Sequence, residues 1–286
     1  MRPQPESLGT LVDEAAPQGR REIRSLLVGA GHRPNKNLGQ NFLVDPNIVN
    51  KLVSLAKVDG DVNVVEIGAG TGTLTGVLAG VASTVVAYEI DPHLEPILAE
   101  TVGGLPNVDI RIADASAIHL EDELPGTPWT LVANLPYNVG TGIVLDALTD
   151  SPKITTFAVV VQREVADRML AGPESRIYGL PSVVAGLHAK GALAFTVSPQ
   201  VFEPQPKVES AIIILDRVEP DPYAPRAIVI AAAAFGQRRK MLRRSLSSVL
   251  EDPVATIASA GIDPTLRAED LAPEEYVAIA RAEEAS

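Results

Sequence analysis

The chain has 286 residues, of which 46% are hydrophobic, with 22 glycines, 23 prolines and no cysteine. This size suits one large core, or a large domain beside a small one, and the missing cysteines exclude disulfides, thiolate nucleophiles and the usual structural zinc sites. The net charge of −12 argues against a nucleic-acid partner at first, but nine acidic residues and two arginines after residue 250 account for −7 of it.

The sequence contains no pattern typical of a membrane-spanning or secreted protein. No apolar run reaches the length that crosses a bilayer, and residues 1–18 lack the apolar segment of a secretory signal. We therefore expect a cytoplasmic protein. We also expect a monomer, with a flexible tail over residues 1–24.

The predicted elements alternate between strand and helix. After Asp45, the sequence "PNIVNKLVSLAK" predicts a helix, because Asp followed by Pro makes a good N-cap and first helical position. Short β-branched runs predict strands at 62–67, 84–90, 108–113, 130–134, 156–162, 193–197 and 210–215. Alternating strands and helices predict a mostly parallel sheet covered on both faces, and the last two strands, with no obvious helix between them, predict an antiparallel pair at one edge.

The C-terminal part has a different pattern. The Pro-rich stretch "RVEPDPYAP" at 217–225 breaks the alternation, and only helical patterns follow it. The sequence therefore predicts an α/β domain over 25–220 and a small all-helical domain over 221–286.

The clearest ligand signal is "VVEIGAGTGTLT" at 64–75, where a buried strand runs into Gly68, Gly70 and Gly72. Glycines let backbone amides approach a ligand, and the G-x-G-x-G spacing is more typical of S-adenosylmethionine binding than of pyrophosphate binding. A glycine turn can also serve packing alone.

Two acidic residues lie at the ends of the next two predicted strands. Glu89 is placed to accept hydrogen bonds from the ribose hydroxyls of an adenosine, and Asp114 to accept one from an adenine amine. Either could instead cap a helix. Because ligands of parallel sheets bind at the carboxyl ends of the strands, these residues and Asn134 are expected at one rim.

The sequence "NLPYN", Asn134 to Asn138, ends the fourth predicted strand. Pro136 cannot donate to a sheet and holds Leu135 extended, which predicts a rigid corner. An adenine N6 amine is a poor nucleophile, and hydrogen bonds to the Asn134 side-chain oxygen and to the carbonyl of Leu135 or Pro136 would free its lone pair. Tyr137 would stack on the extruded base, although a strand-ending turn with a surface tyrosine has the same pattern.

The stretch "QRRKMLRRSL" at 237–246 concentrates positive charge. At about 100° per residue, a helix through it would bury one face and expose Arg239, Lys240, Arg243 and Arg244 on the other, with Arg238 beside them. The basic face could be an ordinary solvated surface or a phosphate-binding one.

Six ordered motifs together resemble the KsgA-type ribosomal RNA adenine dimethyltransferases. They are "NLGQNFLVD" (37–45), "EIGAGTGTLT" (66–75), "NLPYN" (134–138), "VQREVADRMLAGP" (161–173), "VFEPQPKVESAIIIL" (201–215) and "FGQRRKMLRRSL" (235–246). The likeness implies a Rossmann-like class I S-adenosylmethionine-dependent methyltransferase fold with a seven-stranded sheet, and a small C-terminal helical domain.

The resemblance also implies roles for single residues. Asn41 and Leu43 would close over the methionine part of the cofactor, and Gly68 would lie against it. Phe202 would sandwich the target base opposite Tyr137, although on its own it is more typical of a core residue.

The implied reaction is dimethylation of two adjacent adenines in a hairpin loop near the 3′ end of small-subunit ribosomal RNA, inside the assembling subunit, without a metal. The basic residues would contact phosphates, together with a second group at the N-terminus: Arg20, Arg21, Arg24, Arg33 and Lys36.

The chain departs from the family pattern in three places, namely at Ala69, over the stretch 140–142 and at the pair Leu180 and Pro181. Two other functions stay open: a large-subunit RNA methylase that gives antibiotic resistance, which shares the corner motif, and a non-catalytic assembly factor on the same fold.

Overall fold

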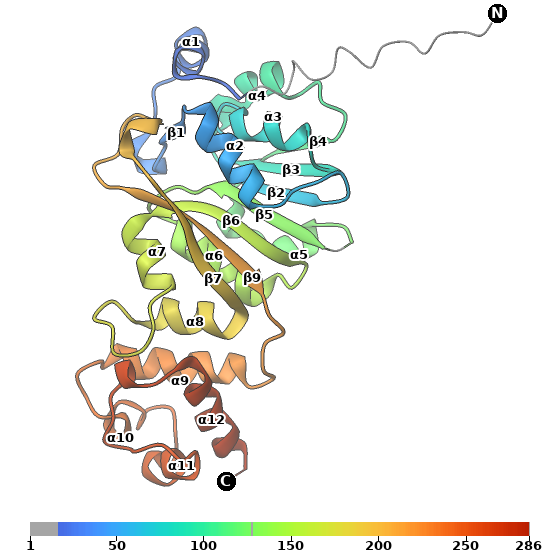
Figure 1. Ribbon diagram of the computed structural model, residues 1–286. Coiled ribbons are helices and arrows are strands. Elements are labelled where there is room, and N and C mark those ends of the chain that lie inside the picture. Colours follow the sequence, from blue (N-terminus) through green and yellow to red (C-terminus); the bar gives the residue numbers. More distant parts are fainter. Residues whose placement is uncertain (1–16, 127, 286) are drawn as a thin grey trace, which may run out of the picture.

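The computed structural model describes residues 17–126 and 128–285 and is built around one seven-stranded sheet (Figure 1). The strand order is β4-β3-β2-β5-β6-β9-β7, and every neighbouring pair is parallel except those made by β9. The strands are β2 Asn63–Ile67, β3 Thr84–Glu89, β4 Val108–Ile112, β5 Trp129–Asn134, β6 Ile154–Gln162, β7 Ala189–Val197 and β9 Ser210–Arg217. All seven predicted strands are therefore confirmed, as is the mostly parallel sheet.

The predicted antiparallel edge pair is also confirmed. β9 lies between β6 and β7 and runs antiparallel to both, so β7 forms the edge of the sheet. The chain turns back after β7, so the last strand lies inside the sheet and not at its edge. The sequence pattern alone does not specify this position.

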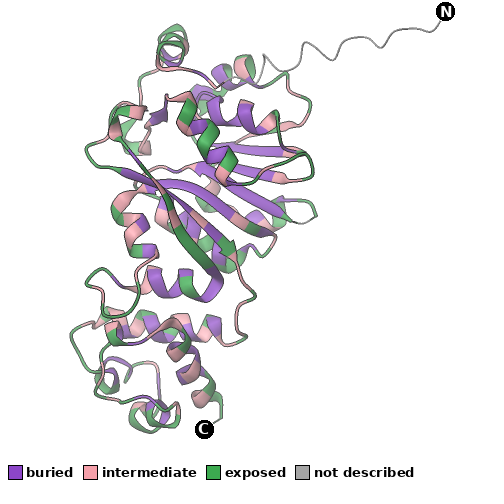
Figure 2. Ribbon diagram, viewed as in Figure 1, coloured by how far each residue is buried: buried purple, intermediate pink, exposed green. Residues whose placement is uncertain are grey.

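Helices cover both faces of the sheet (Figure 1). The helices α2, α3 and α4 pack on one face, where Leu52, Leu78 and Leu98 join the strand residues in one core cluster. The helices α5, α6, α7 and α8 pack on the other face. Figure 2 shows the result: the strands in the middle of the sheet are buried, because both of their faces meet apolar side chains.

The helix boundaries follow local signals. The α-helices are α1 Arg20–Gly29, α2 Pro46–Leu55, α3 Thr73–Ala79, α4 Glu95–Thr101, α5 Leu120–Glu123, α6 Gly140–Asp150, α7 Arg163–Met169, α8 Leu180–His188, α9 Ala224–Gly236, α10 Leu242–Ser245, α11 Pro253–Ser259 and α12 Pro273–Glu284. The short 3₁₀ helices are η1 Lys36–Leu38, η2 Pro92–Leu94, η3 Ala115–Ala117, η4 Pro199–Val201 and η5 Ala268–Asp270. At the start of α2, the Asp45 side chain accepts a hydrogen bond from Asn47 N, as its N-cap position predicts.

The N-terminal prediction needs a correction. The predicted tail extends to residue 24, but α1 begins at Arg20, and its Ile23 is buried against Phe42, Leu94 and Ile97. This apolar contact offsets the entropy of ordering the segment. Residues 1–16 of the predicted tail lie outside the described residues.

The helices α9 to α12 form a layer beyond α8 (Figure 1). Their core cluster includes Ile230, Leu242 and Tyr276 and also takes in Tyr178 and Leu187, from just before α8 and from α8 itself. The two parts of the chain thus share apolar contacts across the Pro-rich stretch, and a domain boundary near residue 220 stays a prediction.

The basic segment does not form the single helix that the sequence predicts. α9 ends at Gly236, a turn follows, and α10 begins only at Leu242. The amide of Leu242 donates to Leu266 O at 2.7 Å and that of Arg243 to Pro264 O at 3.1 Å, and these tertiary bonds replace the helical ones. No described helix is long and apolar enough to cross a membrane.

Candidate active site

The glycine turn after β2 lies directly against the end of β3. The amides of Gly68 and Ala69 both donate to Tyr88 O, at 2.8 and 3.0 Å. Gly70 has φ of +62°, and a Cβ there would meet the Phe42 ring at 3.2 Å. The left-handed backbone and this close contact explain why glycine is required at that position.

Glu89 joins the same turn to the end of β3. Its Oε2 accepts a hydrogen bond from Gly70 N at 2.8 Å, and its Oε1 accepts one from Asp91 N at 2.9 Å. Burial raises the pKa of Glu89, while these backbone bonds act in the opposite direction. Each oxygen keeps a second lone pair, so the carboxylate can still accept hydrogen bonds from a ribose.

Asp114 follows β4 and is exposed. Its Oδ1 accepts hydrogen bonds from the Ser116 amide at 2.9 Å and from the Ser116 hydroxyl at 2.6 Å, so it caps η3. The capping role that the sequence left open is therefore present, and Oδ2 is the oxygen left for an adenine amine.

At the corner after β5, the amide group of Asn134 has a fixed orientation. Its Nδ2 donates to Asn41 O at 2.9 Å, which leaves Oδ1 as an acceptor. Pro136 O accepts hydrogen bonds from Val139 N at 3.3 Å and Gly140 N at 2.9 Å, at the start of α6. Of the two carbonyls proposed from the sequence, that of Leu135 is therefore the better acceptor for a substrate.

The segment that precedes α2 is held against this corner. Asn138 Nδ2 donates to Asn37 O at 3.1 Å, and a Cβ on Gly39 would come within 3.3 Å of Pro136 Cβ. The Asn41 side chain donates to Gly39 O at 2.9 Å, and Leu43 is buried in the short strand β1 Phe42–Leu43. The predicted cofactor segment and the predicted catalytic corner thus touch.

A partly buried hydrogen-bond network holds the other side of this segment. Gln40 Nε2 donates to Asp91 Oδ2 at 2.8 Å, and Gln40 Oε1 accepts from Asn35 N and is 3.2 Å from His32 Nε2. Burial opposes ionisation of Asp91, but hydrogen bonds from Gln40 and His93 outweigh it and lower the pKa of Asp91. The sequence analysis missed this network, which joins residues far apart in the chain.

The two rings predicted to stack on the base, those of Tyr137 and Phe202, differ in how far they are buried. Tyr137 is half-buried at the rim, and its hydroxyl lies 2.6 Å from Ser210 Oγ in β9. Phe202 is fully buried in the core, in the short strand β8 Phe202–Glu203 that pairs with β1. In this conformation Phe202 offers no free face to a base, so its role in stacking stays a prediction.

Two adjoining cavities lie along the rim, with volumes of about 60 and 30 Å³. Phe42, Gly68, Gly70 and Asn134 line both of them, Glu89 lines the larger and Leu43 the smaller. The structure therefore brings the predicted cofactor residues together, with Asp114 beyond them at the end of β4.

Glu66 also lines the smaller cavity, and the sequence analysis gave it no role. It is 1% exposed, and neither carboxyl oxygen has a hydrogen-bond partner among the described residues. The available signal was an acidic residue inside an otherwise apolar strand.

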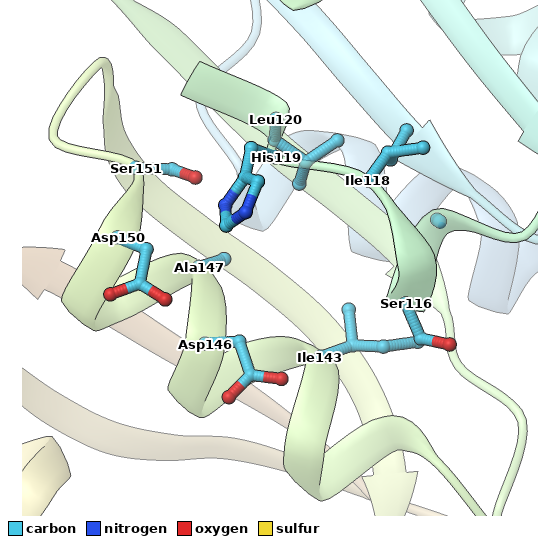
Figure 3. A pocket seen from close by; sticks show the side chains of 10 residues that line it. Ser116, Ile118, His119, Leu120, Ile143, Asp146, Ala147, Asp150 and Ser151 are labelled. Atoms are coloured by element: carbon cyan, nitrogen blue, oxygen red, sulfur yellow. The ribbon is translucent and has the colours of Figure 1, made fainter. Parts of the chain in front are cut away.

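A separate cavity of about 110 Å³ lies between η3 and α6, and the His119 ring, Asp146 and Asp150 lie around it (Figure 3). None of the predicted site residues lines this cavity. Among the residues that the structure describes, no group of His, Asp and Glu has a geometry that could hold a metal ion.

The predicted RNA-binding residues lie on the C-terminal helical layer. Arg239, Lys240, Arg243 and Arg244 are exposed. Arg238 differs, because its guanidinium pairs with Glu269 at 2.8 Å and donates to Arg176 O at 3.0 Å. It is therefore engaged within the protein, while the other four form no salt bridge among the described residues.

The N-terminal arginines proposed for phosphate contact are partly engaged too. Arg20 and Arg24 in α1 both pair with Glu203, at 2.9 Å for Arg24. These pairs hold α1 to β8 and leave less of the N-terminal charge for RNA.

Comparison with known proteins gives a consistent result. Residues 31–283 match the sequence model of a family described as ribosomal RNA adenine dimethylase. The ribosomal RNA small subunit methyltransferase A of Nocardia farcinica is 43% identical over 281 residues, covering 93% of this chain and 96% of that protein. That of Kineococcus radiotolerans is 42% identical, covering 91% and 89%.

Two solved structures are similar in fold. The crystal structure of the 23S rRNA methyltransferase ErmE has a TM-score of 0.65 and 28% identity, covering 85% of this chain and all of that one. A dimethyladenosine transferase from Plasmodium falciparum has a TM-score of 0.68 and 21% identity, covering 83% and 95%.

Proposed function

Because the chain belongs to the ribosomal RNA adenine dimethylase family, we propose that it dimethylates N6 of two adjacent adenines in the 3′-terminal hairpin loop of 16S ribosomal RNA. The observation that carries this is the Asn134 amide, held by Asn41 so that its Oδ1 is left as an acceptor beside the glycine turn. The small-subunit substrate is favoured over a large-subunit one by the identity of 40–43% to proteins named small subunit methyltransferase A, against 28% to the 23S enzyme.

The residues at the rim fit S-adenosylmethionine. Glu89 can accept from a ribose, Gly70 allows a close backbone approach, and the unpaired carboxyl of Glu66 is a partner for a positively charged group. When bound, this cofactor supplies an electrophilic methyl group with a neutral leaving group, so the reaction needs positioning more than acid or base catalysis.

The corner supplies that positioning. Asn134 Oδ1 and Leu135 O would accept the two N6 hydrogens of an extruded adenine, which favours a pyramidal nitrogen with its lone pair free. Tyr137, held through its hydroxyl by Ser210, would stack on the base. The proton becomes acidic once the new N–C bond forms, and water can remove it.

The partner is the assembling small subunit. The exposed residues Arg239, Lys240, Arg243 and Arg244 would contact phosphates, so binding should weaken as salt rises. We place the protein in the cytoplasm, where ribosomes assemble, and expect it to act as a monomer.

The test is methyl transfer from labelled S-adenosylmethionine to purified unmethylated small subunits, with large subunits in parallel and nucleoside analysis of the product. Asn134→Ala removes the acceptor, and Asn50→Ala makes the same change at an exposed position of α2. We expect N6-dimethyladenosine in small-subunit RNA only, lost with Asn134→Ala and kept with Asn50→Ala.

Two other outcomes would overturn the proposal. Label in the large subunit would assign the protein to the resistance methylases. Absence of label from both subunits, with binding to the small subunit retained, would identify a non-catalytic assembly factor.

A further inference from the structure

The strand β2 buries one carboxyl group that the sheet does not need. Glu66 is 1% exposed, and among the described residues neither its two oxygens nor the hydroxyl of the neighbouring Thr75 in α3 has a hydrogen-bond partner. An unpaired polar group in the interior costs free energy that a valine or leucine at this position would not. A role in the fold alone does not explain this residue.

Burial favours the neutral form of this carboxyl group in the free protein. Burial raises the pKa of Glu66 to about 8; Thr75 lowers it in part, and the charge of Glu89 on β3 raises it further. The groups that share its cavity from the other elements are uncharged: Leu43 of β1, Val49 of α2, Leu74 of α3 and Asn134 of β5. Glu66 can therefore change its charge when a cation enters.

The position of Glu66 suggests which cation that is. The small cavity that it lines also contains Leu43 and Gly68, the residues proposed to hold the methionine part of the cofactor. S-adenosylmethionine carries positive charge on its sulfonium and ammonium groups, and a nearby positive charge favours the ionised form of a carboxyl group. Glu89, the other carboxylate at the rim, is already bound by two backbone amides.

We propose that Glu66 releases its proton to solvent when S-adenosylmethionine binds and takes a proton up again when the product leaves. This inference rests on the proposed function. In it, the Glu66 carboxylate carries its negative charge only while the cation is bound. The product has lost the sulfonium charge, so it supports the ionised form of Glu66 less well. Glu66 thereby favours the cofactor over the product and helps the exchange of one for the other between successive methyl transfers.

The experiment is isothermal titration calorimetry of the full chain with S-adenosylmethionine, at pH 7 in two buffers of different ionisation enthalpy, which counts the protons released. A group with a pKa about one unit above the pH should release roughly 0.9 proton, and the Kd should fall roughly tenfold from pH 6 to pH 7. S-adenosylhomocysteine should release fewer protons.

Two variants separate Glu66 from other groups. Glu66→Gln keeps the shape of the neutral acid and should release no proton, with a Kd that no longer depends on pH in this range. Glu100→Gln, the same change on an exposed carboxylate of α4, should behave like the wild type.

The outcomes also separate this inference from the proposed function. Saturable cofactor binding without proton release, or equal release by Glu66→Gln, would overturn the role of Glu66 and leave the methyltransferase assignment intact. Equal release with cofactor and product would refute the discrimination between them. A wild type that binds no cofactor in any buffer would overturn the proposed function itself.

Discussion

The buried Glu66 should make the stability of the free protein fall as the pH rises. In the unfolded chain its pKa is near the usual 4.5, and in the fold burial raises it to about 8. Between these two pH values the folded state holds a proton that the unfolded state has released. The free energy of unfolding therefore falls as the pH rises. The loss levels off above about pH 9, where Glu66 is ionised in both states.

The size of the effect follows from the two pKa values. Proton linkage gives a loss of about 3 to 4 kcal/mol of unfolding free energy between pH 5 and pH 8 for this one group. Glu66 is fully buried, so solvent screening does not reduce this value. The amide in Glu66→Gln cannot ionise, so this variant should not show the fall in unfolding free energy with pH. Any effect of the amide itself on stability is the same at every pH.

The assay is urea unfolding of wild type and Glu66→Gln at pH 5, 6, 7 and 8, without cofactor. The difference in unfolding free energy between the two proteins is the quantity to follow, because the other titrating groups cancel in it. Relative to the wild type, the unfolding free energy of Glu66→Gln should rise by about 3 to 4 kcal/mol from pH 5 to pH 8. Parallel curves for the two proteins would refute the reasoning, since they would mean that Glu66 is ionised in the fold or reaches water.

Four further results are expected. Arg217→Met should lower the unfolding free energy by about 3 kcal/mol in urea titrations, because the guanidinium bonds four carbonyls at the end of α6 and the start of β6. Asn134→Asp should lose methyl transfer about as completely as Asn134→Ala, since aspartate cannot donate to Asn41 O; activity within tenfold of wild type would contradict this. Tyr137→Phe should keep most of the transfer rate and Tyr137→Ala should lose at least tenfold, because stacking needs the ring and not the hydroxyl. Arg243→Ala should weaken binding to small subunits and lower the slope of log affinity against log salt by about one, measured by filter binding.

The sheet was predictable because its strands carry their own signal. β2, β3, β5 and β6 are runs of β-branched and apolar residues buried on both faces, so their residue types alone indicate strands. The two-residue strands β1 and β8 carry no such signal, since their pairing depends on the contact of residues 42–43 with 202–203. Local patterns cannot encode contacts between such distant segments.

The same limit explains the errors in the C-terminal segment. The residues around Leu242 and Leu246 have the correct apolar spacing, and both are fully buried, as the pattern predicts. The helix breaks nevertheless, because the amides of Leu242 and Arg243 bond the loop at 264–266. Apolar spacing thus predicted which side chains face the core, while tertiary hydrogen bonds decided the backbone that carries them.

The site shows where strand-end reasoning works and where it stops. It placed Gly68, Glu89 and Asn134 at one rim, because the carboxyl ends of neighbouring parallel strands must meet there. It could not foresee that Asn134 Nδ2 would be bound by Asn41 O. That bond ties the orientation of the Asn134 amide to the segment at residues 37–43, which lies against the corner and lines the rim cavity. We therefore expect a change in this segment to alter methyl transfer as well as cofactor binding, because the same contact fixes the direction of Asn134 Oδ1.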